Sequence, residues 1–339
     1  MAKLAQRSTS GAYYIGKVEK ALFSRPFQQF TGKVQLILTS PPFPLNQKKS
    51  YGNLQGDDYL QWLSDLGPTL ERLLKPNGSV VIEIGNSWEP GRPVQSLLPL
   101  QALMELTKRS DSGGLRLIQQ FVCYNPSRLP SPAQWVTVNR LRAVDSYTHV
   151  WWLALSDYPK ADNSKVLRPY SAAMNALHER GSFNGGKRPS QHNINEAAFL
   201  KNCGGSIAHN FLEVDALDKN RKVRLPAVPT AFSFSNTASN DYFSRQCKDR
   251  GLEPHPARMP LGLAAFFIAF LTEPDDLVLD PFAGSNTTGY AAAMLGRQWL
   301  AVDAEPTYVE QSRLRFTDPD LKQQRGIQNS GTSTKNCKG

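Results

Sequence analysis

A segment near residue 280 has the residue types of a nucleotide-binding loop. It runs Asp280-Pro-Phe-Ala-Gly-Ser-Asn-Thr-Thr-Gly289 and lies between a short apolar run and a stretch with helical spacing. An acidic residue that ends a strand, followed by small residues that open a helix, places backbone N–H groups where a nucleotide can bind. The segment therefore predicts such a loop, with an ordinary α/β turn bearing surface acids as the alternative.

The segment departs from two common nucleotide-binding patterns, and this narrows the kind of nucleotide that it could bind. Asn286 stands where the Gly-x-Gly-x-x-Gly pattern of nicotinamide dehydrogenases has its second glycine, and no Gly-Lys-Ser/Thr follows as in a phosphate-binding P-loop. Asp303 ends the next apolar run, nineteen residues after Gly284, which suits a carboxylate that binds ribose hydroxyls. The pattern disfavours a dehydrogenase.

A second motif, Thr39-Ser-Pro-Pro-Phe43, follows an apolar run near the start of the chain. Two prolines fix φ and carry no N–H, so the carbonyl groups of this loop are held rigidly. Rigid acceptors beside an aromatic ring can bind an exocyclic amino group while the ring stacks on a base. The alternative is a rigid proline turn with a core phenylalanine.

Together the two motifs resemble those of the DNA amino-methyltransferases, in particular the cytosine-N4 enzymes of bacterial restriction–modification systems. That family has Ser-Pro-Pro-Phe or Ser-Pro-Pro-Tyr in its catalytic loop and Asp-Pro-Phe-x-Gly-Ser in its cofactor loop. The catalytic loop comes first here, as in the β arrangement of the family. The resemblance covers about residues 35–316, with further matches at Lys48–Asn53, Leu129–Pro132, Trp151–Trp152, Gly204–Ile207 and His255–Arg258.

The resemblance implies an α/β fold: a Rossmann-like, mostly parallel sheet of the S-adenosylmethionine-dependent methyltransferase type, with an inserted, irregular target-recognition region. It implies transfer of a methyl group from S-adenosylmethionine to the N4 amine of a cytosine flipped out of double-stranded DNA, with a cognate restriction endonuclease as a further partner. No cysteine follows a proline, so the nucleophile of cytosine-C5 enzymes is missing.

For catalysis, the resemblance implies roles for the loop Ser40, Pro41, Pro42 and Phe43. The Ser40 hydroxyl and the Pro41 carbonyl would accept hydrogen bonds from the amine, and Phe43 would stack on the base. Glu83, a carboxylate within an apolar run, would take up the released proton directly or through Ser40. A Glu83 that faces solvent or caps a neighbour is the alternative.

For the cofactor, the resemblance implies that one loop and one separate acid bind it. Asp303 is expected at the ribose, and His255 is expected to shape the methionine end, with a structural role as its alternative. The family often has Gly-Asp before the catalytic strand, with the aspartate at the adenine amine, whereas this chain has Lys17 there. A lysine cannot accept that hydrogen bond. The loop residues assigned to the cofactor are Asp280, Phe282, Gly284, Ser285 and Thr287.

The charge distribution suggests a polyanionic partner but does not decide between this and a merely solvated surface. The chain carries a formal net charge of +10, and residues 1–60 and 156–250 each hold an excess of five positive charges. A localised excess suits phosphate binding, because neutralised phosphates release counterions. A basic surface kept for solubility is the alternative. The candidate DNA contacts are Lys48, Lys49, Tyr51, Arg128, Arg140, Arg142, Lys187 and Arg188.

The sequence leaves two further functions open. An adenine-N6 DNA methyltransferase shares fold and cofactor but usually has Asp or Asn at the position of Ser40, so the serine favours cytosine. A non-catalytic DNA-binding protein with a decayed cofactor loop is favoured only by Lys17 and opposed by the intact residues at 40–43 and 280–285.

The elements that position these motifs alternate between strand and helix, which predicts a mostly parallel sheet. Residues 34–38, 79–84, 115–124, 146–155, 277–280 and 299–303 are predicted as strands, and 57–74, 97–108, 261–271, 286–295 and 306–316 as helices. Pro68 is expected to kink or split its helix, and residues 75–78 to form a turn. The expected division is a catalytic half (1–155), a target-recognition region (156–250) without sustained periodicity, a cofactor-binding half (251–316) and a disordered tail (317–339).

Length and composition fit this organisation. A chain of 339 residues can bury a core large enough to fold without disulfides or a structural metal. Its 20% charged and 40% hydrophobic residues are typical of a globular protein. Residues 261–271 form the most apolar run and are too short to span a membrane, and no signal peptide is visible. Four scattered cysteines oppose a structural zinc site. We expect a cytoplasmic bacterial protein that associates with the nucleoid through DNA.

Overall fold

The structure is a computed structural model that describes residues 2–43, 54, 56–183, 186–187, 189–191, 193–194, 199–213, 242–255, 258–319 and 321. Within these residues a nine-stranded sheet has the order β1-β2-β11-β10-β3-β4-β6-β5-β9. Five of its eight neighbouring pairs are parallel, which confirms the mostly parallel sheet. Its strands are β1 (Lys3–Arg7), β2 (Gly11–Ile15), β3 (Val34–Thr39), β4 (Leu74–Gly85), β5 (Arg116–Tyr124), β6 (Tyr147–Ala154), β9 (Phe211–Glu213), β10 (Leu277–Asp280) and β11 (Gln298–Asp303).

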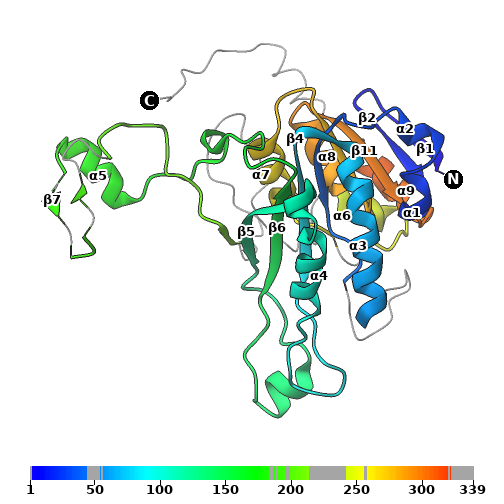
Figure 1. Cartoon of the computed structure of the whole chain (residues 1–339), viewed down its shortest axis with the longest axis horizontal. Helices are drawn as coiled ribbons and strands as arrows, with labels where there is room; N and C mark the ends of the chain where they lie inside the picture. The colour runs from blue at the N-terminus through cyan, green and yellow to red at the C-terminus, as the bar shows by residue number, and fades with distance from the viewer. Residues whose placement is uncertain are drawn as a thin grey trace.

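Helices cover both faces of this sheet (Figure 1). The first four pack on one face and α7 to α9 on the other. The α-helices are α1 (Val18–Ala21), α2 (Arg25–Gln28), α3 (Gly56–Leu73), α4 (Leu98–Thr107), α5 (Ala172–Arg180), α6 (Tyr242–Asp249), α7 (Leu261–Leu271), α8 (Thr287–Met294) and α9 (Thr307–Arg315). Short helical turns lie at Ser110–Ser112, Gln134–Val138 and Asn163–Val166, and β7 (Gly186–Lys187) pairs with β8 (Asn193–Ile194) apart from the main sheet.

Alternation along the strands divides the interior into two cores. In β4, Val80 and Ile82 face the layer of α1 to α4, whereas Val81 faces α7 and α8. The two tryptophans of β6 separate in the same way, Trp151 to the first core and Trp152 to the second. This two-sided burial explains why the central strands are continuous apolar runs.

The strand order brings the two sequence motifs to one edge of the sheet. β3 and β10 pair in parallel, with Leu279 opposite Ile37, so the loops after Thr39 and Asp280 leave from the same side. β11 follows on the other side of β10, which adds the loop after Asp303. Ligands of parallel α/β sheets bind outside the carboxyl ends of the strands, so this edge is where a site is expected.

Two local expectations need correction. Pro68 does not split its helix: α3 continues to Leu73, because its buried face packs on one core before and after the proline. This packing offsets the roughly 3 kcal/mol that an interior proline costs. Residues 75–78 belong to β4, where they form an irregularity in the ladder, since Val34 pairs with Leu74 whereas Leu36 already pairs with Ser79.

The middle of the chain contains more regular structure than its composition indicates. Helices α5 and α6 were not expected there, nor was β9, which adds to the edge of the sheet beside β5. α6 packs through Phe243 and Cys247 on Leu314 of α9. Figure 1 shows α5 and β7 standing away from the sheet. Residues 214–241 and 322–339 lie outside the described residues, so the expected disordered tail is largely outside them too.

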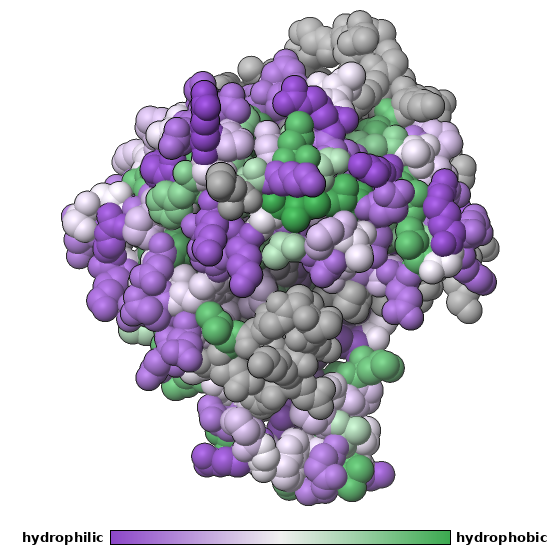
Figure 2. All heavy atoms as spheres, turned by 90° about the vertical axis from the view of Figure 1, so that its right-hand side faces the viewer, coloured by the Kyte–Doolittle hydropathy of each residue, from purple (hydrophilic) through white to green (hydrophobic). Residues whose placement is uncertain are grey.

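The surface on the side of β1, α1 and α9 is mostly hydrophilic, with small apolar patches between the polar side chains (Figure 2). Strands β1 and β2 in this part of the molecule were also missing from the sequence prediction.

No helix in the described ranges is long and apolar enough to cross a membrane.

Candidate active site

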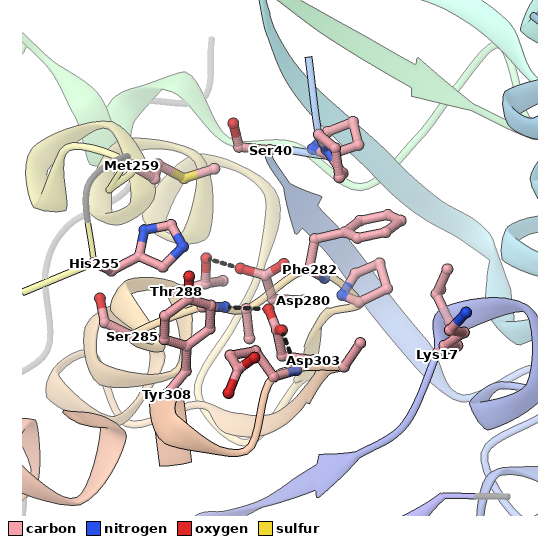
Figure 3. A pocket seen from close by; sticks show the side chains of 18 of the residues that line it. Lys17, Ser40, His255, Met259, Asp280, Phe282, Ser285, Thr288, Asp303 and Tyr308 are labelled. Carbon is pink, nitrogen blue, oxygen red and sulfur yellow. Dashed lines mark hydrogen bonds between the residues drawn. The ribbon is translucent and has the colours of Figure 1, made fainter. Parts of the chain in front are cut away.

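A cavity of about 640 Å³ opens at the edge of the sheet where the motif-bearing loops meet. Its walls come from segments far apart in the sequence, and Figure 3 shows their side chains converging around Asp280 and Asp303. This volume suits a small organic ligand. The lining includes nearly all the residues expected to contact the base and the cofactor, namely Ser40, Pro41, Pro42, Phe43, His255, Asp280, Phe282, Gly284, Ser285, Thr287 and Asp303.

Asp280 joins the two motifs directly. One carboxylate oxygen accepts from Thr39 Oγ1 at 2.7 Å and from the Phe282 N–H at 3.1 Å, and the other accepts from Thr288 Oγ1 at 2.7 Å. Burial raises the pKa of Asp280 to about 6, while these donors lower it. With both oxygens bonded to protein groups, Asp280 holds the two loops against each other.

Asp303 stands at the carboxyl end of β11. Its Oδ2 accepts from the Gly284 N–H at 2.8 Å, and its Oδ1 accepts from the Glu305 N–H at 2.9 Å. Burial raises its pKa, and these backbone donors lower it. The carboxylate is thereby oriented at the cavity wall, where it retains acceptor capacity for a ligand hydroxyl.

Two features of the backbone at position 284 favour glycine. Its φ is +47°, and a Cβ at this position would lie 3.0 Å from His255 Nε2. The His255 ring in turn packs edge-on against Tyr308, at 4.4 Å between ring centres. His255 and Gly284 therefore form a close-packed wall of the cavity.

The loop between β10 and α8 is fixed from behind by Arg315. This buried guanidinium donates to the Ser285 carbonyl at 2.7 Å and to Ser285 Oγ at 2.9 Å, and it lies 4.0 Å from the centre of the Phe243 ring. Asn286, with φ of 61°, caps α8 by accepting from the Gly289 N–H. Ser285 is thus held by a residue thirty positions away.

The catalytic-loop candidates lie on the opposite side of Asp280. Ser40 lies close enough to Glu83 for its hydroxyl, as a hydrogen-bond donor, to lower the pKa of that carboxyl. Glu83 also accepts from Thr148 Oγ1 at 3.1 Å and is buried in β4, so it neither faces solvent nor caps a helix. Burial raises the pKa of Glu83 to about 7, against the lowering effects of Thr148, Arg128 and Ser40. A carboxylate that titrates near neutrality is suited to proton transfer.

Phe43 rests on the backbone of β4. A Cβ at Gly85 would lie 2.8 Å from the Phe43 ring, so the glycine allows the ring to approach the strand. The ring borders the cavity next to the two prolines of its loop.

The DNA candidates have varied positions. Arg128 donates to the Tyr147 carbonyl at 3.0 Å and pairs with Asp145 at 3.7 Å, which ties it to the protein. The Arg142 guanidinium carbon lies 2.9 Å from the centre of the Trp88 ring, whereas Arg140 is exposed. Lys48, Lys49, Tyr51, Arg188 and the Lys187 side chain lie outside the described residues.

Sequence reasoning missed several residues of the site. Tyr13 donates to the Gly284 carbonyl at 2.8 Å, and Trp62 and Glu19 line the cavity. The helical spacing around Trp62 predicted its helix but not its position at the cavity, and no local signal marked Thr148 or Arg315, because their roles depend on neighbours distant in sequence.

Comparison with known proteins gives consistent matches. The family model described as DNA methylase (N6_N4_Mtase) matches residues 34–314. The type II methyltransferase M.PvuII of Proteus hauseri is 37% identical over 325 residues, covering 95% of this chain and 88% of that protein. The solved structure of the PvuII DNA methyltransferase (cytosine-N4-specific) superposes with a TM-score of 0.67 at 32% identity, covering 95% of this chain and 92% of that one.

A more distant structure shares the fold. The Thermus thermophilus protein TTHA0409, solved as a complex with S-adenosyl-L-methionine, gives a TM-score of 0.51 at 17% identity. The match covers 91% of this chain and 93% of that one.

Proposed function

This chain belongs to the N6/N4 DNA methylase family, and from that premise we propose that it transfers a methyl group from S-adenosylmethionine to the N4 amine of cytosine in DNA. The observation that carries the proposal is the direct contact between its two loops. Thr39, the neighbour of Ser40, donates to Asp280 at the start of the cofactor loop. The base-binding and cofactor-binding candidates therefore share one cavity.

The cavity fits the cofactor in shape and chemistry. A side chain at Gly284 would crowd His255, so the glycine keeps this wall of the cavity open, and the Asp303 carboxylate has acceptor capacity for ribose hydroxyls. Phe282 and Trp62 provide aromatic surface for a purine. When bound, S-adenosylmethionine supplies an electrophilic methyl group on its sulfonium sulfur.

The protein's own contribution is to align the amine and remove its proton. The lone pair of the N4 amine is delocalised into the ring, so the nitrogen is a weak nucleophile. Ser40 Oγ and the Pro41 carbonyl accept its two N–H groups and favour the attacking geometry, which is electrostatic stabilisation combined with positioning. Ser40 passes its own proton to Glu83 as it takes one from the nitrogen.

The remaining site assignments support binding of the flipped base and its duplex. Phe43 and His255 both line the cavity, where Phe43 would stack on the cytosine ring and His255 would border the methionine end of the cofactor. Residues 156–250 recognise the target sequence through the major groove. Phosphates are contacted by Lys48, Lys49, Tyr51, Arg140, Arg142, Lys187 and Arg188, which hold the duplex while the base is extruded.

The biological role follows from the reaction. As a type II modification enzyme, the protein marks host DNA in a restriction–modification system, and its partner is an endonuclease that cleaves the same site unmethylated. An N6-methylated adenine is the competing product, because the family model spans both chemistries.

The test is identification of the methylated nucleoside. The purified protein is incubated with S-adenosylmethionine and unmethylated genomic DNA, and the DNA is digested to nucleosides for mass spectrometry. We expect N4-methylcytosine, reduced about 100-fold or more by Ser40→Ala. Ser112→Ala, an exposed serine in a short helical turn, is the matched control and should keep full activity. N6-methyladenine would overturn the assignment of Ser40, and no product would overturn the proposed activity.

A further inference from the structure

The rim of the cavity carries a lysine where a carboxylate is expected. Lys17 lies between β2 and α1, and the Gly16 N–H donates to the Asp303 carbonyl at 2.8 Å, so this segment lies beside the proposed ribose site. Figure 3 shows Lys17 and Phe282 on one side of the cavity and His255 on the other. An ammonium group can only donate, so Lys17 leaves the amine of an adenine without an acceptor.

Glu19, two residues further on, supplies a carboxylate on the same side. It lines the cavity, and its Oε1 accepts a 2.6 Å hydrogen bond from Trp62 Nε1. The Trp62 ring contacts the Phe282 ring edge-on, at 5.6 Å between centres. Trp62 therefore holds Glu19 next to the aromatic surface proposed for the purine.

The other carboxylates in the described lining are engaged elsewhere. Asp280 is buried and bonded to Thr39 and Thr288. Asp303 is oriented by backbone donors at the end of β11, and Glu305 Oε1 accepts from the N–H and hydroxyl of Thr307. Among the carboxylates of the described lining, Glu19 is the one held beside the Phe282 ring, through its hydrogen bond from Trp62.

We infer that Glu19, positioned by Trp62, accepts the hydrogen bond of the adenine amine and replaces the acid displaced by Lys17. The inference rests on the proposed function, because it presumes that the cavity binds an adenosyl cofactor. It makes Glu19 a specificity residue for adenine over a purine with a carbonyl at position 6, which would place an acceptor against the carboxylate.

The test measures cofactor binding without catalysis. S-adenosylhomocysteine and its inosine analogue, in which a carbonyl replaces the amine, are titrated calorimetrically into the full-length protein and its variants. We expect Glu19→Ala to weaken S-adenosylhomocysteine binding by about 10- to 100-fold, the usual contribution of a hydrogen bond to a charged group, and to leave the inosine analogue within about twofold. The ratio of the two dissociation constants, which measures the preference for adenine, should therefore fall by the same factor in Glu19→Ala.

Two further variants separate selectivity from folding. Trp62→Phe leaves a smaller aromatic ring and removes the donor to Glu19, and we expect the same loss of adenine preference at a smaller magnitude. Glu19→Gln retains an oxygen acceptor and should bind S-adenosylhomocysteine between wild type and Glu19→Ala. Lys20→Ala, on the same helix but outside the cavity lining, is the control and should match wild type.

The outcomes are distinguishable. Unchanged adenine preference in Glu19→Ala, or an equal loss for both ligands, would overturn the inference while leaving the proposed function intact. Failure of the wild-type protein to bind S-adenosylhomocysteine at all would overturn the proposed function, and this inference with it.

Discussion

Glu83 should determine how the reaction depends on pH. Burial raises the pKa of Glu83 to about 7, so the carboxylate is ready to accept a proton only above neutrality. We expect kcat to rise with pH between 6 and 8, with its midpoint near 7, and Glu83→Gln to lower kcat by about 100-fold or more and remove this dependence. Rates measured over this pH range test it, with the exposed Glu310→Gln as control. A wild-type profile without the rise would contradict the role.

The same group should make stability depend on pH. The folded pKa of Glu83 lies above its ordinary value, so the folded protein binds the extra proton between about pH 4.5 and 7. The stabilisation from this proton is fully present below pH 4.5 and is lost as the pH rises through 7. We expect Glu83→Gln to gain up to about 3 kcal/mol in unfolding free energy relative to wild type at pH 8. Denaturant titrations at pH 5 and 8 would show whether the difference grows with pH.

Gly284 offers a second test at the level of one residue. Gly284→Ala must strain a backbone with φ of +47° and push a methyl group against His255, so we expect at least a tenfold weaker binding of S-adenosylhomocysteine and about 1–2 kcal/mol lower stability. Gly32→Ala is a matched control, because Gly32 also has positive φ (+67°) but nothing within 4 Å of the added Cβ. That variant should lose similar stability and keep its binding.

At the scale of elements, Asp280 fastens β3, β10 and α8 together through two threonines. Thr39→Val keeps the shape of the side chain but leaves the buried carboxylate short of a donor, which raises its pKa further. We expect a loss of about 1–3 kcal/mol in unfolding free energy, measured by denaturant titration. Thr137→Val, whose exposed hydroxyl bonds only to a local carbonyl, should change stability by less than about 0.5 kcal/mol. Equal losses of unfolding free energy in Thr39→Val and Thr137→Val would argue against the role of Asp280 in fastening these elements together.

Elements with local signals could be predicted from the sequence. The apolar runs of β3, β10 and β11 indicate buried strands, and their bounds agree with the structure to within one residue. Helix α5 also had local signals, since Ser171 caps its start by accepting from the Met174 N–H and Gly181 ends it in the left-handed conformation. Those signals were outweighed by the polar composition around them.

Long-range relations could not be predicted from local pattern. Nothing near Ser40 indicates that residue 280 lies beside it, and only the resemblance to a family linked the two loops. The contacts of Glu83 with Thr148 and of Ser285 with Arg315 depend on strand and helix packing that no spacing encodes. The expected candidates therefore line the cavity, whereas the residues that hold them in place were missed.

For the whole molecule, we expect particular arginines, rather than the net charge of +10 as such, to determine how DNA binding depends on salt. Arg140 is exposed, so we expect Arg140→Ala to weaken DNA binding for all sequences and to reduce the slope of log K against log salt by about one. Arg128 is bonded to Tyr147 and Asp145, so Arg128→Ala should lower stability and leave the slope nearly unchanged. Binding titrations between about 50 and 200 mM salt, a range chosen to resolve such slopes, would separate the two.

The hydrogen bond between Thr39 and Asp280 also bears on the order in which ligands bind. It connects the segment proposed to receive the base to the segment proposed to receive the cofactor, so we expect ordering of one to favour the ordered form of the other. Thermodynamic reciprocity then applies: the factor by which the cofactor tightens DNA binding equals the factor by which DNA tightens cofactor binding. We expect product release to follow the same coupling, so that departure of the methylated duplex weakens the binding of the spent cofactor.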